Sequence, residues 1–508
     1  MRAATNDPDW KADATLPGVS GAEQRFEWWR RTVGLFAGPA LFVALLALPL
    51  PGLSADAHRL AAIVSLVVAW WITEAIPVAA TALLGASLTV VLGVATAQDA
   101  LAPFASPTIY LFLGSFILAE AIAAHGLDRR IAFGLLRRRW LASSPGRVRL
   151  AAGLLAAGLS MWMSNTATAA MLLPVVFGLL GGAARARGNG AATGFLLMLA
   201  YSASIGGVAT PVGTPPNLIA LGMLERLAGR DIDFFRWMAL GVPLSLAMFG
   251  ALALITRSLY PPGTADVQAP PEEASSPPAG PLSRGEKNTI VAFGTAVTLW
   301  ITPGVAALAF GSSSPTYRFL STRLDEGVVA LLAALLLFVL PVDWKRRQFT
   351  VTWAEASRID WGTILLFGGG LSLGRLMFTT GLAEKIGTGL VAASGADSLW
   401  TITAVMCAVA ILITEATSNT AATNMLVPVA LAISQAAGVS PLPPALAVAF
   451  GASMAFMLPI STPPNAIAYG TGLVPITAMI RCGLLLDLVS FLIIVFGLRL
   501  LCPLLGLV

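Results

Sequence analysis

The chain has 508 residues, of which 56% are hydrophobic and 11% are charged, and its formal net charge at pH 7 is +5. Because soluble domains carry about 25% charged residues, this composition excludes one large soluble core and predicts an integral membrane protein. The arginines gather in loops between apolar runs, a distribution that sets membrane topology and does not indicate nucleic-acid binding.

Apolar runs of about 20 residues, long enough to cross a bilayer as helices, recur along the chain. A charged segment, 1–32, comes first, has no signal-peptide pattern and is expected in the cytoplasm. A first membrane half, 33–257, precedes a Pro- and Ala-rich stretch, 258–287, expected to be a flexible cytoplasmic linker. A second half, 288–508, follows. We predict eleven crossings, near residues 33–51, 59–76, 78–96, 107–125, 195–224, 237–257, 288–306, 327–342, 361–380, 443–472 and 476–506.

Three further features complete this outline of an all-α, polytopic membrane protein. The Arg-rich stretch 127–150 is either a helix lying along the inner membrane surface or a plain topology signal. The cysteines (Cys407, Cys482 and Cys502) lack the spacing of metal ligands and are expected to be buried. The chain has few cysteines, and its basic residues lie in loops expected on the inner side of the membrane. Both features favour a location in a bacterial inner (plasma) membrane.

Two apolar segments, 151–184 and 398–436, differ from the others because each carries Ser-Asn-Thr near its middle. The first contains "SMWMSNTATAAMLLP" from Ser160, and the second contains "TEATSNTAATNMLVP" from Thr414. Each is either one over-long helix or a re-entrant hairpin with the tripeptide at its tip. We favour hairpins, since arginines flank 151–184 on both sides, whereas 398–436 has few basic neighbours, as is typical of extracytoplasmic flanks. The two hairpins are therefore expected to enter from opposite faces.

The tripeptides belong to a longer internal repeat. "TIYLFLGSF" from Thr108 matches "TILLFGGGL" from Thr363, and "GLDRRIA" from Gly126 matches "GLAEKIG" from Gly381. After the hairpin segments, Thr-Pro-Pro-Asn occurs at 214–217 and again at 462–465. An opposite-facing repeat with interrupted helices at corresponding positions is typical of secondary transporters.

The chemistry of these motifs suits small ions. Pro-Pro removes two amide donors, so each Thr-Pro-Pro-Asn should unwind its span. One end of an unwound span offers free carbonyls for a cation, and the other offers N–H groups and a positive dipole end for an anion. Two units of a tip beside an unwound span could hold one anion between them and one small cation each. A lone Ser-Asn-Thr more often only bonds a neighbouring helix, but the duplication of both motifs argues against that reading.

With these motifs and "WWITEAIPVAATALL" from Trp70, the chain from about residue 33 resembles the divalent anion:sodium symporter family. The resemblance implies sodium-coupled transport of dicarboxylates and related anions by an elevator mechanism, in a homodimer with scaffold and mobile parts. It implies Na⁺ as the coupling ion, with two or more ions per cycle, and the 127–150 stretch as a horizontal arm helix.

The resemblance also implies which residues bind. Substrate contacts are expected at both tips and both unwound spans: Ser164, Asn165, Thr166, Thr214, Ser418, Asn419, Thr420, Thr462 and Pro463. The first sodium would use Ser160, Ser164, Asn165 and Gly213, and the second Thr414, Ser418, Asn419 and Ser461. Ser160 and Thr414 each precede a tip serine by four residues, a spacing that would put both oxygens on one helix face.

Several alternatives stay open. Among the intramembrane carboxylates Glu74, Glu120 and Glu415, Glu415 adjoins the second site and has either a buried hydrogen-bonding role or a proton-coupling role. The carrier could be a sodium-independent exchanger or be driven by protons, and its cargo could be sulfate or citrate. An enzyme is not expected, since no His, Asp or Cys side chains converge at the motifs. C4-dicarboxylates such as succinate are favoured because two tips can hold one carboxylate each.

Overall fold

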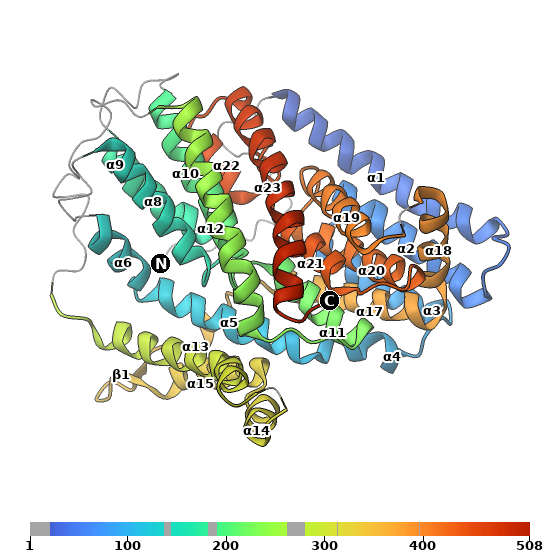
Figure 1. Ribbon diagram of the computed structural model, residues 1–508, viewed down its shortest axis with the longest axis horizontal. Helices are drawn as coiled ribbons and strands as arrows, with labels where there is room; N and C mark the ends of the chain where they lie inside the picture. Colours follow the sequence, from blue (N-terminus) through green and yellow to red (C-terminus); the bar gives the residue numbers. More distant parts are fainter. Residues whose placement is uncertain (1–20, 137–143, 181–189, 262–279, 312, 396) are drawn as a thin grey trace.

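The computed structural model describes residues 21–508 apart from 137–143, 181–189, 262–279, 312 and 396 (Figure 1). The first half contains α1 (Gly21–Ala47), α2 (Ala55–Thr73), α3 (Val78–Val91), α4 (Ala97–Leu101), η2 (Ala102–Ala105), α5 (Pro107–Ala124), α6 (Leu127–Leu136), α8 (Pro145–Ser160), α9 (Asn165–Leu179), α10 (Gly190–Gly207), α11 (Pro215–Ala228) and α12 (Phe234–Leu259).

The second half contains α13 (Arg284–Phe310), α14 (Pro315–Arg323), α15 (Glu326–Val339), β1 (Pro341–Asp343), β2 (Gln348–Phe349), α16 (Trp353–Ala356), α17 (Trp361–Thr379), α18 (Leu382–Ser394), α19 (Leu399–Thr414), α20 (Asn419–Ala436), α21 (Leu442–Gly451), α22 (Pro463–Gly470) and α23 (Ile476–Leu504).

The fold is that of an all-α polytopic membrane protein. Among the described residues, eight helices are long and apolar enough to cross a membrane, and several apolar helices are shorter. The small antiparallel ribbon of β1 and β2 was not predicted from the sequence. It forms because the Asp343 carboxylate accepts the backbone N–H groups of Lys345 and Arg346, which closes a tight turn.

Contacts between the halves are reciprocal. Helix α5 packs on α15 while α17 packs on α3; α10 packs on α22 while α21 packs on α11; and α9 packs on α22 while α20 packs on α11. Helices α12 and α23, the last of each half, pack on one another near the middle of the molecule (Figure 1). Each of these helices therefore has a counterpart in the other half with matching neighbours.

The core lies around α10 and α21. Every residue of α21 is buried, and so is every residue of α10 except the first. Neither helix carries a charged residue, which suits a position surrounded by other helices. In contrast, α13, α14, α15 and β1 lie together at one corner of the molecule (Figure 1). The three cysteines are buried and unpaired, as expected.

Several boundaries differ from the predicted ranges. The segment predicted as 1–32 overlaps α1, which begins at Gly21, and residues 1–20 lie outside the described part of the chain. The predicted linker 258–287 is shorter at both ends, because α12 continues to Leu259 and a capping box of Ser283 and Glu286 starts α13 at Arg284. Spans 195–224 and 443–472 are each two helices.

The stretch 127–150, for which a surface helix was one of two interpretations, divides into α6 and the start of α8, and 137–143 lie outside the described residues. The first hairpin arm starts at Pro145, before the predicted residue 151. The Arg149 side chain explains the early start: it is buried, and its guanidinium donates to the Tyr260 carbonyl at 2.6 Å. This hydrogen bond lowers the cost of burying the guanidinium inside a helix that packs in the core.

Candidate functional site

The two Ser-Asn-Thr motifs form tips between pairs of helices. Helix α8 ends at Ser160 and α9 begins at Asn165, while α19 ends at Thr414 and α20 begins at Asn419. Ser164 is the N-cap of α9, with its Oγ accepting the Ala167 N–H at 3.1 Å. Ser418 caps α20 in the same way, with its Oγ accepting from Ala421 at 3.2 Å. Each segment is thus two helices joined at the tripeptide.

The residues one turn before each tip bond the tip asparagine. The Ser160 hydroxyl donates to Asn165 Oδ1 at 2.6 Å, and the Thr414 hydroxyl donates to Asn419 Oδ1 at 2.8 Å. The helical-spacing argument for Ser160 and Ser164 was wrong in its detail, because α8 ends at Ser160 and Ser164 has extended backbone angles. The partner of each hydroxyl is the asparagine across the break.

Both Thr-Pro-Pro-Asn motifs interrupt their spans, as predicted. Helix α10 ends at Gly207 and α11 begins at Pro215; α21 ends at Gly451 and α22 begins at Pro463. Thr214 and Thr462 are extended N-caps, and the prolines take the first helical positions, where no amide donor is needed.

The asparagine of each motif fixes the unwound loop, a role that was not predicted from the sequence. Asn217 Nδ2 donates to the carbonyls of Gly207 at 2.9 Å and Thr210 at 2.7 Å. Asn465 Nδ2 donates to the carbonyls of Ala455 and Leu458, both at 3.0 Å. In both loops the acceptors lie ten and seven residues before the asparagine. The signal was present in the sequence, since Asn ends both copies of the motif.

Each tip contacts the unwound loop of its own half. In the first half, the Thr210 hydroxyl donates to the Met161 carbonyl. A carbon added at Gly213 would lie 3.0 Å from that same carbonyl oxygen, and one added at Gly207 would lie 2.6 Å from Asn165 Oδ1. The structure therefore brings together three predicted sodium ligands beside the Met161 carbonyl: Ser160, Asn165 and Gly213.

The second half repeats this arrangement with different partners. The Ser461 hydroxyl lies within hydrogen-bond distance of the Glu415 carbonyl, at 2.9 Å, and the Thr414 hydroxyl lies within hydrogen-bond distance of the Ala452 carbonyl, at 2.7 Å. Each hydroxyl therefore has two acceptors for its single proton, since Asn419 Oδ1 also faces Thr414 and Glu415 Oε2 also faces Ser461. The structure thus brings Thr414, Asn419 and Ser461 close to one another. Oxygen-only surroundings of hydroxyls and carbonyls suit a hard cation such as sodium.

Exposure divides the predicted residues into two groups. Predicted cation ligands outside the tips are buried: Ser160, Gly213, Thr414 and Ser461. Tip residues and Pro463 are exposed or half-buried: Ser164, Asn165, Thr166, Ser418, Asn419, Thr420 and Pro463. The first group suits dehydrated ions, and the second suits a ligand that enters and leaves. Thr214 and Thr462, predicted for the substrate, are buried.

Four helix N-termini belong to this region, those of α9, α11, α20 and α22. Helix α9 packs on α22, and α20 packs on α11, so each tip helix meets the broken helix of the other half. The positive ends of helix dipoles and free N–H groups favour an anion. None of the four carries an acidic residue in its first turn.

Glu415 has a buried hydrogen-bonding role, one of the two alternatives considered for it. Its side chain is 5% exposed. Oε1 accepts the N–H groups of Phe456 at 2.6 Å and Met457 at 2.8 Å, and Oε2 accepts the Ser461 hydroxyl at 2.7 Å. The carboxylate thus holds the unwound loop between α21 and α22 against the second tip.

A residue outside the motifs also reaches the second tip. Arg30 in α1 donates to the Ala416 carbonyl at 2.7 Å and forms an ion pair with Glu74 at 3.1 Å. The Thr417 hydroxyl donates to the Trp71 carbonyl at 2.8 Å. Nothing in the sequence pattern linked Arg30 to a residue 386 positions away.

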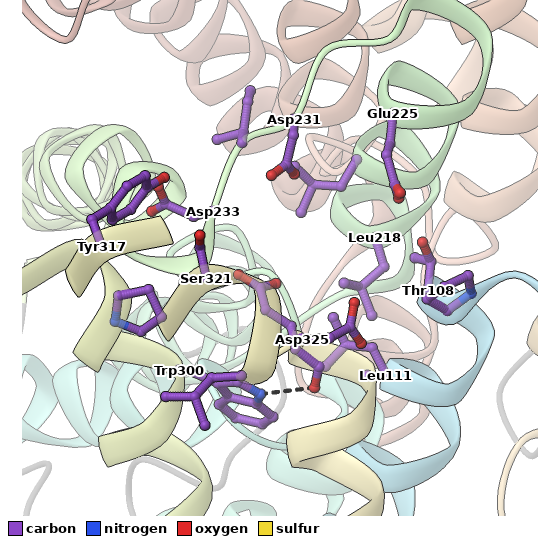
Figure 2. Close-up of a pocket in the computed structure, with 17 residues that line it drawn as sticks. Thr108, Leu111, Leu218, Glu225, Asp231, Asp233, Trp300, Tyr317, Ser321 and Asp325 are labelled. Atoms are coloured by element: carbon purple, nitrogen blue, oxygen red, sulfur yellow. Dashed lines mark hydrogen bonds between the residues drawn. The ribbon is translucent and has the colours of Figure 1, made fainter. Parts of the chain in front are cut away.

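A separate pocket of about 150 Å³ lies between the α11–α12 connection and α13–α15, and Figure 2 shows the side chains that line it. Its lining includes five carboxylates: Glu225, Asp231, Asp233, Asp325 and Glu326. Glu326 joins its two sides by accepting the Phe234 N–H at 2.5 Å. Because like charges repel, this pocket is unsuited to an anionic substrate, and none of the predicted site residues lines it.

The paired tips and broken helices define the class of this protein as a membrane transporter rather than an enzyme. The family model described as the sodium:sulfate symporter transmembrane region matches residues 27–508. The chain therefore belongs to the sodium:sulfate symporter family, the family of sodium-coupled anion symporters that its sequence resembles.

Individual relatives agree with this membership. The chain is 33% identical to a sodium-dependent dicarboxylate transporter, SdcS, of Staphylococcus saprophyticus over 93% of this chain and 91% of the relative. It is 34% identical to an uncharacterized transporter of Haemophilus influenzae over 85% of this chain and 89% of that one. The crystal structure of the Alcanivorax borkumensis YdaH transporter matches with a TM-score of 0.53 at 16% identity, covering 95% of this chain and 97% of that chain, which shows a shared fold.

Proposed function

We propose that this protein carries C4-dicarboxylates, such as succinate, malate and fumarate, across the membrane together with sodium ions. The observation that carries the proposal is the duplicated unit of tip and unwound loop, in which the same hydrogen bonds recur at the same spacings. Two units, each with one exposed tip, match the two carboxylates of a short diacid. The name of the Staphylococcus saprophyticus relative supports this cargo and this coupling ion.

Within this proposal, the residues have distinct roles. The tips and the four helix N-termini hold the carboxylates, through Ser164, Asn165, Thr166, Thr214, Ser418, Asn419, Thr420, Thr462 and Pro463. The first sodium site comprises Ser160, Ser164, Asn165 and Gly213, and the second comprises Thr414, Ser418, Asn419 and Ser461. Sodium in these sites would supply positive charge beside each tip, which lowers the cost of dehydrating a dianion.

The proposed topology has eleven crossings and two re-entrant hairpins that enter from opposite faces, with a cytoplasmic N-terminus in the inner membrane. The reciprocal packing of the two halves supports an inverted repeat. We assign α8–α12 and α19–α23 to a mobile part and the remaining helices to a scaffold, arranged as a homodimer. Elevator-like movement of the mobile part would then expose the site to each side in turn.

The test is uptake of radiolabelled succinate into proteoliposomes with an inward gradient of sodium, of protons, or of neither, with and without internal succinate. Sodium-dependent uptake into empty vesicles is the expected result. Uptake that ignores sodium and requires internal succinate would identify an exchanger and remove the cation sites. Uptake driven by the proton gradient alone would identify a proton-coupled carrier.

Sulfate is the second candidate cargo, because the description of the family model names it. Competition separates the two: excess unlabelled succinate should abolish succinate uptake, whereas excess sulfate or citrate should leave most of it. Stronger inhibition by sulfate than by succinate would reverse the assignment.

A further inference from the structure

Asp487 is a buried carboxylate that the proposed site does not use. It lies in α23, about 17 Å along the helix axis from Ile476 at 1.5 Å per residue. Its side chain is 4% exposed, and neither carboxylate oxygen has a hydrogen-bond partner among the described residues. Charged groups at this depth are costly unless they are paired, so an ionisable residue here is a candidate for function.

A second unsatisfied oxygen lies one turn further along the same face. Ser490 is fully buried, and its hydroxyl has no hydrogen-bond partner within the described chain. Some buried hydroxyls of other helices donate to the carbonyl of the preceding turn, as Ser434 does to Ala430 at 2.7 Å and Thr256 does to Leu252 at 2.8 Å. Others, such as those of Ser202 and Ser204 in α10, have no partner among the described residues. Ser490 makes no such bond, which leaves its oxygen available as a ligand beside Asp487.

The loop beside Asp487 is held by another carboxylate. Gly483, one turn before Asp487 in α23, lies against the backbone of Phe456 and Met457. Glu415 accepts the N–H groups of these two residues, so Asp487 lies beside the loop that Glu415 holds. Glu415 accepts two backbone N–H groups and lies 2.7 Å from the Ser461 hydroxyl. Tyr201 donates to the Phe456 carbonyl at 2.6 Å. No ion pair to Asp487 or Glu415 is present in the described part of the chain.

This region therefore contains two buried carboxylates and one buried hydroxyl. None of the three has a cationic partner among the described residues. We propose that Asp487, Glu415 and Ser490 bind one additional sodium ion. This inference rests on the proposed sodium coupling and adds a site to it. Hard cations prefer such all-oxygen surroundings, and an ion here would offset the charge of both carboxylates.

The site is linked to the second half-site and has no equivalent in the first. Ser461, a predicted ligand of the second sodium, donates to Glu415 Oε2, so occupancy of one site bears directly on the other. In the first half, the position of Glu415 is occupied by Met161, and α12, the counterpart of α23, has no acidic residue. The structure therefore predicts one additional ion, not two.

The test compares the full-length protein and Asp487→Asn in proteoliposomes, by counting ²²Na⁺ ions taken up per labelled succinate. The expected result is one sodium ion fewer per succinate in the variant. Asp231→Asn, which removes a carboxylate from the pocket of Figure 2, is the matched control and should keep the wild-type ratio. An unchanged ratio in Asp487→Asn overturns the proposal, as does an unchanged sodium ratio with loss of one co-transported proton.

Ser490→Ala keeps the proposal testable if Asp487→Asn does not fold. This variant should need a several-fold higher sodium concentration for half-maximal uptake. At saturating sodium, its half-saturating succinate concentration should stay unchanged. An unchanged sodium dependence would contradict a ligand role for Ser490. Failure of the proposed function is distinguishable, because it would appear as sodium-independent uptake in the unmodified protein.

Discussion

The asparagines of the two Thr-Pro-Pro-Asn motifs should determine both stability and transport. Each is 0% exposed and donates two hydrogen bonds to carbonyls of an unwound loop. In Asn217→Ala or Asn465→Ala both bonds are lost and two buried carbonyls are left without these donors. At about 1–2 kcal/mol for each bond, the free energy of unfolding should fall by about 2–4 kcal/mol. Because the loop would also lose its shape, uptake should fall by more than about tenfold per folded molecule.

Asn288→Ala is the matched control for this prediction. Asn288 also donates two bonds, to the Pro341 carbonyl at 3.2 Å and the Thr350 hydroxyl at 2.8 Å, but it lies in α13 away from both tips. Because Asn288 is half-buried, its replacement should lower stability by a smaller amount, and it should leave uptake per folded molecule near wild type. Stability would be measured by thermal or denaturant unfolding of the purified protein, and uptake with labelled succinate. If the three variants transport alike, the unwound loops do not form the site, and the reasoning fails.

Three further predictions test the site and its surroundings. Asn165→Ala and Asn419→Ala should each abolish succinate uptake while the purified protein stays folded by size-exclusion chromatography; normal uptake in both would remove the two-tip site. Gly213→Ala should abolish sodium-dependent uptake, because the added carbon would lie 2.5 Å from the Gly207 carbonyl oxygen. In the control Gly158→Ala, the added carbon meets nothing within 4 Å, so this variant should transport normally. Equal activity of the two variants would contradict the close packing of Gly213 against Gly207. Burial raises the pKa of Asp128, in α6, above 3.8. The folded protein therefore binds the Asp128 proton more tightly than the unfolded chain does. The stability that this group contributes is present at low pH and is lost as the pH rises through the raised pKa. Asp128→Asn should therefore melt at a higher temperature than the wild type at neutral pH and at a similar temperature below pH 3.8, and the opposite pH trend would refute the assignment.

The sequence predicted the two helix breaks and the two tips, because each of these features is local. Pro-Pro cannot continue a helix, whatever surrounds it, so the breaks before Pro215 and Pro463 follow from composition alone. A serine before a helix is a strong N-cap, and both tip serines take that role. The repeat of both motifs then indicated two equivalent units before any contact was known.

Tertiary structure decided the rest, because it depends on residues distant in sequence. That α9 meets α22 and α20 meets α11 follows from how two halves fit together, and no periodicity within one half specifies it. Arg30 at the second tip, Arg149 inside α8 and Asp487 in α23 are ionisable residues in a chain of mostly apolar helices. Sequence patterns do not tell which partner, if any, such a side chain will meet. Only the folded chain shows which of these side chains have a partner, and that Asp487 has no hydrogen-bond partner among the residues that the structure describes.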